Sequence, residues 1–386
     1  MPEPHRLSRR IALGALAGLA LPGLARGQLL AAAAQTTPQA APPVAPVAPP
    51  VPNPALAASM DALRADWAAF RGRFMAPEGR LVDTGNNRVS HSEGQGYGLL
   101  LAVRADDRAS FDKMLAWTRR VLKRRNDTLS AWRFTPDAAN PVADQNNASD
   151  GDLFISWALL EAGRRWGQAE HTTLGTAIAR DVLKHVVRRT AGQTLLLPGA
   201  RGFDRRDRIV VNPSYYAFPA IRALAQAVPD PAWVRLATDG LGLLRAARFG
   251  KWNLPPDWLS IAKSDGALSL PDDFPPRFSF DAVRVPLYLA WARLGTEPAV
   301  SNSATFWADP SHNVIPAWVD LTSNTIAPYA ASPGVAALAR FASAQRAGSP
   351  GEPRGLPALA ASPDYYSAVL GMLVRLAWSD LFAPAA

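Results

Sequence analysis

The sequence contains no cysteine and only five histidines. The absence of cysteine excludes disulfide bonds, a thiolate metal site and a cysteine nucleophile, although it does not exclude an oxidising compartment. The histidines lack the spacing of metal ligands; they are His5, His91, His171, His185 and His312. We therefore expect no metal site.

Several functional motifs are also missing. The chain has no serine nucleophile elbow, no phosphate-binding loop, no dinucleotide fingerprint and no repeat of fixed period. The net charge is +9, but the Lys and Arg residues are scattered. The densest basic run, residues 119–125, is typical of a solvated helix end, so nucleic-acid binding is not expected.

Apolar and aromatic residues are abundant. Of the 386 residues, 48% are hydrophobic, and twelve are Trp. A chain of this length and composition can bury a large core, and we expect one large domain. Indole rings fill cores and also stack on sugars.

The first 34 residues are typical of a twin-arginine signal peptide, which directs export of a folded protein. Arg9 and Arg10 precede an uncharged apolar stretch at residues 11–24. Residues 23–25 and 31–34 both offer a cleavage site. These 14 apolar residues are few for a membrane span, but a retained, uncleaved anchor is an alternative.

Residues 35–54 contain eight prolines and no charge, which favours an extended linker without a core. The folded domain is therefore expected at residues 55–386. No later hydrophobic run is long enough to cross a bilayer. We expect a periplasmic or secreted protein without a membrane span in its mature form.

Apolar spacing in the domain is helical almost throughout, and alternating strands are few. The expected helices are residues 60–70, 96–105, 110–123, 152–166, 172–187, 213–227, 231–247, 281–294, 335–344 and 365–378. Long connections rich in Gly, Pro, Asn and Asp are expected to carry function, notably 126–147, 195–212 and 251–279. Helices in consecutive pairs suggest an all-α toroid or solenoid.

Two acidic stretches each precede a helical apolar run. They are residues 92–98 (SEGQGYG) and 148–152 (ASDGD). A helix N-terminus favours a negative charge, whereas an apolar wall or second carboxylate raises a pKa. Such a cluster can hold one acid protonated and another ionised, as glycosidic bond hydrolysis requires.

Five segments resemble, in order, the motifs of glycoside hydrolase family 8. They are residues 92–98, 148–163 (ASDGDLFISWALLEAG), 212–215 (NPSY), 256–258 (PDW) and 281–285 (DAVRV). More narrowly, they resemble the endoglucanases encoded with bacterial cellulose synthase. The resemblance covers residues 55–382 and implies an (α/α)6 barrel that hydrolyses β-1,4-glucan internally, with inversion at the anomeric carbon.

Within this resemblance, Glu93 matches the family's general acid, which protonates the leaving glycosidic oxygen. Alone, it could equally be a helix-capping carboxylate. The flanking Gly94, Gly96 and Gly98 are expected to let the backbone approach a ligand closely.

Asp281 matches the general base, which activates a water on the far face of the sugar. Inversion usually places the acid and base carboxyls about 6.5–9.5 Å apart. Alone, Asp281 would be an ordinary N-cap. Arg284, three residues later, is expected to pair with Asp281 and keep it ionised; a surface salt bridge is the alternative.

Asp150 matches a carboxylate that has been interpreted in the family both as a nucleophile and as a sugar-binding group. An inverting mechanism has no enzyme nucleophile, so we expect Asp150 to orient and distort the sugar at the cleavage point. Asp152 points elsewhere on a helix and is expected to be a cap or a supporting partner.

Four aromatic residues in or near these motifs could stack on glucose or fill the core: Tyr97, Trp132, Tyr215 and Trp258. Two positions depart from the family pattern. Phe280 stands where the family often has Tyr before the base, which removes a hydroxyl, and Ser156 stands where Ala is common.

The predicted function is an endo-β-1,4-glucanase without a cofactor, acting on cellulose during its bacterial synthesis, with the cellulose synthase complex as a partner suggested by resemblance alone. A non-catalytic glucan-binding or scaffold protein is one alternative; the three carboxylates argue against it. Chitosanase, lichenase or xylanase activity is another, although the basic charge would repel cationic chitosan unless the cleft is locally acidic.

Overall fold

The structure is a computed structural model that describes residues 54–346 and 355–382. The predicted signal peptide and almost all of the predicted linker lie outside the described residues. Helix α1 begins at Pro54, beside the expected domain boundary. No helix of the described part is both long and apolar enough to span a membrane.

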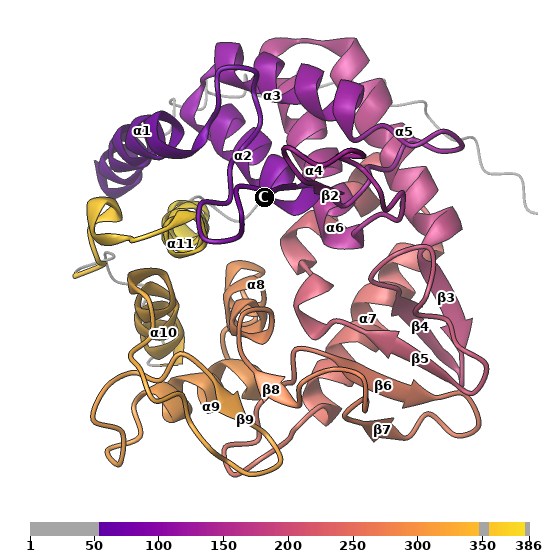
Figure 1. The fold of residues 1–386 in the computed structure, drawn as a ribbon, viewed down its shortest axis with the longest axis vertical. Helices are drawn as coiled ribbons and strands as arrows, with labels where there is room; N and C mark the ends of the chain where they lie inside the picture. Colours follow the sequence, from indigo (N-terminus) through magenta and orange to yellow (C-terminus); the bar gives the residue numbers. More distant parts are fainter. Residues whose placement is uncertain (1–53, 347–354, 383–386) are drawn as a thin grey trace, which may run out of the picture. The chain divides into compact units, whose positions relative to one another are not determined.

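Eleven α-helices of the described residues form two concentric layers (Figure 1). The inner ring closes in the order α2, α4, α6, α8, α10 and α11, with each helix packed on the next and α11 back on α2. Its members are α2 (Ser92–Ala105), α4 (Ser149–Trp166), α6 (Phe218–Ala227), α8 (Val285–Trp291), α10 (Pro333–Arg346) and α11 (Tyr365–Phe382). The outer helices are α1 (Pro54–Phe74), α3 (Arg108–Val121), α5 (Ala169–His185), α7 (Pro231–Ala246) and α9 (Pro298–Trp307).

The pattern of apolar residues in each helix matches how deeply that helix is buried. In the inner helix α4, every residue from Ser149 to Leu159 is buried, because outer helices and neighbouring inner helices surround it. The outer helix α3 instead buries a stripe that includes Phe111, Met114, Leu115 and Thr118, the spacing of one helical face. One large core cluster runs through both layers.

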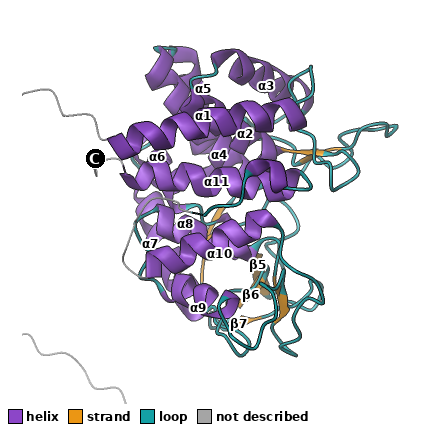
Figure 2. Ribbon diagram, turned by 90° about the vertical axis from the view of Figure 1, so that its left-hand side faces the viewer, coloured by secondary structure: helices purple, strands orange, loops and turns teal. Residues whose placement is uncertain are grey.

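Connection lengths give the ring two different ends. Short turns follow the C-terminal ends of α2 and α4, where Asp106 and Gly167 have φ of 62° and 65°, the left-handed conformation of helix C-caps. Long connections lead into the N-terminal ends of α2, α4, α6, α8 and α10. Figure 2 shows the strands and long loops gathered at one side of the helices.

All strands belong to these long connections and pair antiparallel. Strand β1 (Ser90–His91) pairs with β2 (Arg133–Phe134). The others are β3 (Val187–Thr190) with β4 (Gln193–Leu196), β5 (Arg208–Val211) with β6 (Leu259–Ala262) and β7 (Leu268–Ser269), and β8 (Arg277–Phe278) with β9 (Val319–Asp320). These short ladders fix the loops at the mouth of the ring.

The predicted (α/α)6 architecture is confirmed, and all ten expected helices occur with shifted ends. Two begin later than expected, because Pro219 and Pro286 start α6 and α8, and short 3₁₀ turns precede them: η1 (Pro213–Tyr215) and η2 (Ala282–Arg284). Helix α9 was not predicted, because its Ser, Asn and Thr residues are weak helix formers.

Candidate active site

The three predicted catalytic carboxylates lie at the N-terminal ends of inner helices. Glu93 and Asp150 are each the second residue of a helix, α2 and α4. Asp281 directly precedes η2, which leads into α8. Glu93 lies close enough to Asp150 and to Asp281 to raise the pKa of each. The sequence therefore folds its three candidate acids into one mouth of the ring.

Gly96 and Gly151 allow α2 and α4 to approach closely at this mouth. A Cβ on Gly96 would lie 2.7 Å from Cβ of Phe154, and one on Gly151 would lie 2.4 Å from Oγ of Ser92. Any larger residue would force the two helices apart. The two glycines thus bring together the helix ends that carry the first two carboxylates.

The expectation that the glycines around Glu93 face a ligand is wrong. A Cβ on Gly94 would meet the Tyr365 hydroxyl at 2.5 Å, and one on Gly98 would meet Leu81 at 2.5 Å. These positions are glycine because other parts of the protein pack tightly against α2.

Glu93 and Asp150 lie within hydrogen-bonding reach of each other, and this contact shifts their pKa values in opposite directions. Burial and the adjacent Glu93 raise the pKa of Asp150 well above the ordinary aspartate value. Burial also raises the pKa of Glu93, but Arg284 and His91 outweigh it and lower that pKa below the ordinary glutamate value. These opposite shifts favour the protonated form at Asp150 and the ionised form at Glu93.

Arg284 links the candidate acid to the candidate base. Its guanidinium is almost fully buried and makes an ion pair with Glu93 through Nη1 and with Asp281 through Nη2, the latter at 2.7 Å. Nη2 also donates to Oγ of Ser214 at 3.1 Å. The predicted pairing of Arg284 with Asp281 is present, and the pairing with Glu93 adds to it. Burial raises the pKa of Asp281, and Arg284 opposes this rise.

Asp257 holds the backbone around the candidate base. Its Oδ1 accepts the N–H groups of Ser279, Asp281 and Ala282 at 3.0, 3.2 and 2.7 Å, and its Oδ2 accepts the Ser279 hydroxyl. Burial, with Asp281 nearby, raises the pKa of Asp257 to about 7. Asp257 therefore fixes the backbone position of Asp281 and does not itself occupy the position of the base.

Tyr97 supports Glu93 rather than a sugar. Its side chain is 1% exposed, which leaves no ring face for stacking. Its hydroxyl contacts Glu93 Oε1 at 3.1 Å and the hydroxyl of Tyr288 at 2.7 Å. The expectation of a binding platform at Tyr97 is corrected by this burial.

Trp132 and Tyr215 lie beside the carboxylates and remain partly exposed. Trp132 stacks on His91 with ring centroids 6.0 Å apart, and its Nε1 donates to Asp144 at 2.8 Å. Burial and the carboxylates of Asp150, Asp281 and Glu93 raise the pKa of Tyr215 well above its ordinary value, which places its ring among them. Both remain candidate sugar platforms.

Trp258 is engaged by other rings. It stacks with Phe203 and Phe274 at centroid distances of 5.8 and 4.2 Å, so the structure favours a packing role. Phe280, next to Asp281, is instead 55% exposed and lies edge-on to Tyr366. The Tyr366 hydroxyl donates to the Phe280 carbonyl at 2.9 Å. This exposed phenyl ring is a further candidate platform.

Asp152 fastens a loop and does not face substrate. It is fully buried, and its carboxylate accepts the Ser130 N–H at 2.8 Å and the Asn147 side-chain amide at 2.9 Å. Burial raises the pKa of Asp152 to about 7. It therefore anchors the connection that carries Trp132, which agrees with the supporting role considered from sequence rather than with direct substrate binding.

Four residues of this site were not predicted: Ser214, Asp257, Tyr288 and Tyr366. Ser214 and Asp257 stand inside motifs already recognised in the sequence, so their positions carried a signal. Tyr288 follows Arg284 by four residues, one helical turn. Nothing in the local sequence around Tyr366 distinguishes it from a core residue.

The arrangement can perform acid–base chemistry on a bond placed between Glu93 and Asp281. Within the described residues, no group of three or more His, Cys, Asp or Glu side chains could hold a metal ion. The charged groups that face the site are the three carboxylates and the guanidinium of Arg284.

Known proteins share both the sequence and the fold. The chain is 43% identical to a probable endoglucanase from Novacetimonas hansenii, over 80% of this chain and 88% of that protein. It is 41% identical to an endoglucanase from Cellulomonas uda, over 69% of this chain and 74% of that protein. The structure of the endo-β-1,4-glucanase CMCax from Acetobacter xylinum matches with a TM-score of 0.77 and 43% identity, covering 82% and 98% of the two chains.

The family model agrees with these relatives. The model of glycosyl hydrolases family 8 matches residues 48–380, which include every carboxylate of the site. The predicted family and enzyme class are thereby confirmed, and the chain belongs to the family 8 glycosyl hydrolases.

Proposed function

We propose that the protein is an endo-β-1,4-glucanase that cleaves internal bonds of cellulose with inversion. The observation that carries the proposal is the pair Glu93 and Asp281, held from two different inner helices by one buried guanidinium, that of Arg284. The endoglucanase relatives at 41–43% identity support the same activity.

Glu93 acts as the acid in this proposal. In this proposal the carboxyl pair with Asp150 shares one proton, which the raised pKa of Asp150 favours there in the free enzyme. A sugar hydroxyl that donates to Asp150 stabilises its ionised form and transfers the shared proton to Glu93. Glu93 then protonates the leaving glycosidic oxygen, while Asp150 holds the sugar through bonds that tighten in the transition state.

Asp281 acts as the base on the opposite face of the sugar. Arg284 favours its ionised form, and Asp257 fixes its backbone through three N–H groups. The carboxylate removes a proton from water as the water attacks the anomeric carbon. The reaction consumes one water and leaves Glu93 ionised and Asp281 protonated; proton exchange with solvent restores both, so the proposed steps require no cofactor.

The glucan chain is expected to run across the mouth of the ring. Trp132, Tyr215 and Phe280 offer partly exposed rings beside the carboxylates, and such rings stack on the apolar faces of sugars. The long loops lie at this same mouth (Figure 2). We infer an open site that accepts the middle of a chain.

The biological setting is also a proposal. The export signal at residues 1–34 supports a periplasmic or secreted enzyme, and the resemblance to endoglucanases encoded with cellulose synthase supports a role in cellulose synthesis and contact with the synthase complex. Affinity purification from cellulose-producing cells tests the contact: recovery of synthase subunits supports it, and their absence argues against it.

The activity is tested by measuring reducing ends released from carboxymethyl cellulose, with chitosan, mixed-linkage glucan and xylan as competing substrates. The wild type is expected to prefer carboxymethyl cellulose, and Glu93→Gln and Asp281→Asn to lose activity while remaining folded. Preference for another polymer would reassign the substrate. An inactive wild type that still binds cello-oligosaccharides would favour the non-catalytic alternative.

A further inference from the structure

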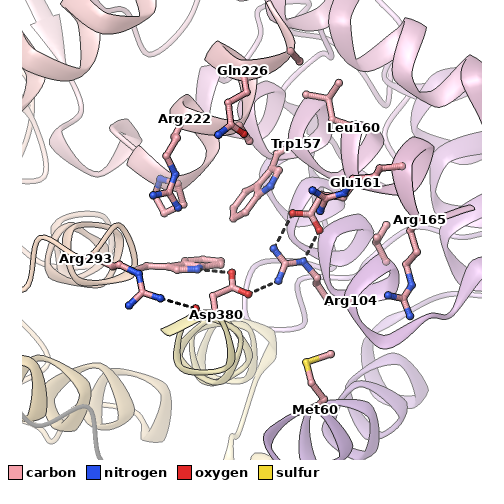
Figure 3. A pocket seen from close by; sticks show the side chains of 16 residues that line it. Met60, Arg104, Trp157, Leu160, Glu161, Arg165, Arg222, Gln226, Arg293 and Asp380 are labelled. Atoms are coloured by element: carbon pink, nitrogen blue, oxygen red, sulfur yellow. Dashed lines mark hydrogen bonds and ion pairs between the residues drawn. The ribbon is translucent and has the colours of Figure 1, made fainter. Parts of the chain in front are cut away.

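A cavity lies at the other end of the helix ring from the catalytic carboxylates (Figure 3). Its volume is about 840 Å³, within the range of about 300–1,000 Å³ that is typical of ligand pockets. Along α2, Arg104 lies eleven residues after Glu93, and along α4, Glu161 lies eleven residues after Asp150. At about 1.5 Å per residue, roughly 16 Å separates the two sites.

The walls of this cavity carry an excess of positive charge. Five arginines line it, against two carboxylates. Both carboxylates, Glu161 and Asp380, are already bound by Arg104, which lies between them. Asp380 also accepts Nε1 of Trp291 at 2.8 Å. Arg104 and the two carboxylates on this wall carry a net charge of −1, and the other four arginines bring the lining to +3.

Two of those arginines have other partners. Arg165 pairs with Asp106 at 2.7 Å, outside the cavity lining. Arg293 donates to the main-chain carbonyls of Asp380 and Leu381 near the end of α11, where a cation suits the helix C-terminus.

Arg164 and Arg222 are different. Both are exposed, and within the described ranges neither makes a hydrogen bond or an ion pair. They come from inner helices that pack on each other, α4 and α6, and both line this cavity. Arg164 lies in the last turn of α4, but Arg222 lies five residues before the end of α6, beyond the reach of the terminal dipole. The helix ends therefore do not account for Arg222.

The cavity also has apolar lining, which suits the uncharged part of a ligand. In Figure 3, Arg222 and Gln226 project from α6 on one side, Trp157 lies in the middle, and the Arg104 cluster lies on the other side. Leu160 and Ala223 add apolar surface. The lining thus combines unpaired cations with an apolar floor.

We propose that this cavity is a binding site for a small multivalent anion, one that carries carboxylate or phosphate groups. Arg164 and Arg222 grip its charged groups, because the planar guanidinium forms paired hydrogen bonds with either group. The site is separate from glycan cleavage and does not rest on the proposed function.

Isothermal titration of the protein with pyrophosphate, and separately with citrate, at constant ionic strength tests the site. At least one anion is expected to bind saturably with one-to-one stoichiometry. The double variant Arg164→Gln/Arg222→Gln should weaken this binding by at least about tenfold, since it removes both charged donors that bind the anion. The matched control Arg120→Gln/Arg235→Gln removes two exposed arginines from α3 and α7 and should bind as wild type.

Each result of the titration either supports or overturns the proposed anion site. Binding of pyrophosphate alone indicates a phosphorylated ligand, binding of citrate alone a carboxylated one, and binding of both a site for either group. Saturable binding to neither anion, or equal weakening in both double variants, would overturn the proposal. Thermal unfolding of the variants verifies that each is folded.

Discussion

Glu93 and Asp281 contact the same guanidinium, that of Arg284, although 188 residues separate them in the chain. One buried cation therefore lowers the pKa of both the candidate acid and the candidate base. It also ties the start of α2 to the turn before α8, on two different sides of the ring.

Replacing Arg284 should move the acid limb of the pH–rate profile. Arg284 opposes the rise in the pKa of Asp281, so its loss raises that pKa further and keeps the base protonated to a higher pH. In Arg284→Gln, the acid limb of kcat/KM should lie at higher pH than in wild type, and Arg284→Lys should lie between them. Unchanged limbs in folded variants would refute this coupling.

The acid and base roles separate with an activated substrate. Glu93→Gln should lower kcat on cello-oligosaccharides by about 10²–10⁴-fold, the usual contribution of acid catalysis. A cello-oligosaccharide with a dinitrophenol leaving group needs no protonation, so this variant should recover most of its rate there. Asp281→Asn should be slow on both substrates. Equal recovery by the two variants would show that the roles are assigned incorrectly.

Asp257 should act on turnover rather than on binding. Asp257→Ala removes the acceptor for three backbone N–H groups beside the base, whereas Asp257→Asn keeps one oxygen acceptor. We expect kcat to fall by roughly 10²-fold in the Ala variant, since small displacements of reacting groups cost about that much, with KM little changed. Asn should restore part of the rate. Wild-type kcat in a folded Ala variant would exclude the positioning role.

Asp152 makes stability depend on pH. Burial raises the pKa of Asp152 from an ordinary value of 3.8 to about 7. Its contribution is therefore fully present below pH 3.8 and is lost as the pH rises through about 7. The free energy of unfolding of wild type, relative to Asp152→Asn, should decrease over this interval.

Urea unfolding at several pH values measures this difference. At low pH, Asp152→Asn should cost about 1–3 kcal/mol, because the amide nitrogen cannot accept the hydrogen bonds that it replaces. Asp272→Asn, at an exposed position, is the control and should change little. A pH-independent difference for Asp152→Asn would contradict its burial as a neutral acid.

Most of the helices were predictable, because apolar spacing is a local property. Helix α9 was missed where Ser, Asn and Thr conceal the pattern. The closure of six inner helices into a ring was not visible in spacing and came from the family resemblance. The long connections expected at residues 126–147, 195–212 and 251–279 are present, because their Gly, Pro, Asn and Asp residues interrupt the helical spacing.

The sequence identified the candidate carboxylates but not the contacts that shift their pKa values. The pairing of Arg284 with Asp281 follows from three-residue helical spacing, whereas its contact with Glu93 joins distant parts of the chain. The roles of Tyr97 and Asp257 depend on burial and on backbone N–H directions, which only the folded chain defines. The glycines around Glu93 were assigned to ligand approach, but they permit close packing around α2.

The configuration of the first product tests the central claim most directly. Proton NMR of a cello-oligosaccharide digest, recorded before mutarotation, distinguishes the two anomers at the new reducing end. If Glu93 protonates the leaving oxygen and Asp281 activates water on the opposite face, the α-anomer must appear first. First appearance of the β-anomer would require an enzyme nucleophile and would contradict the account.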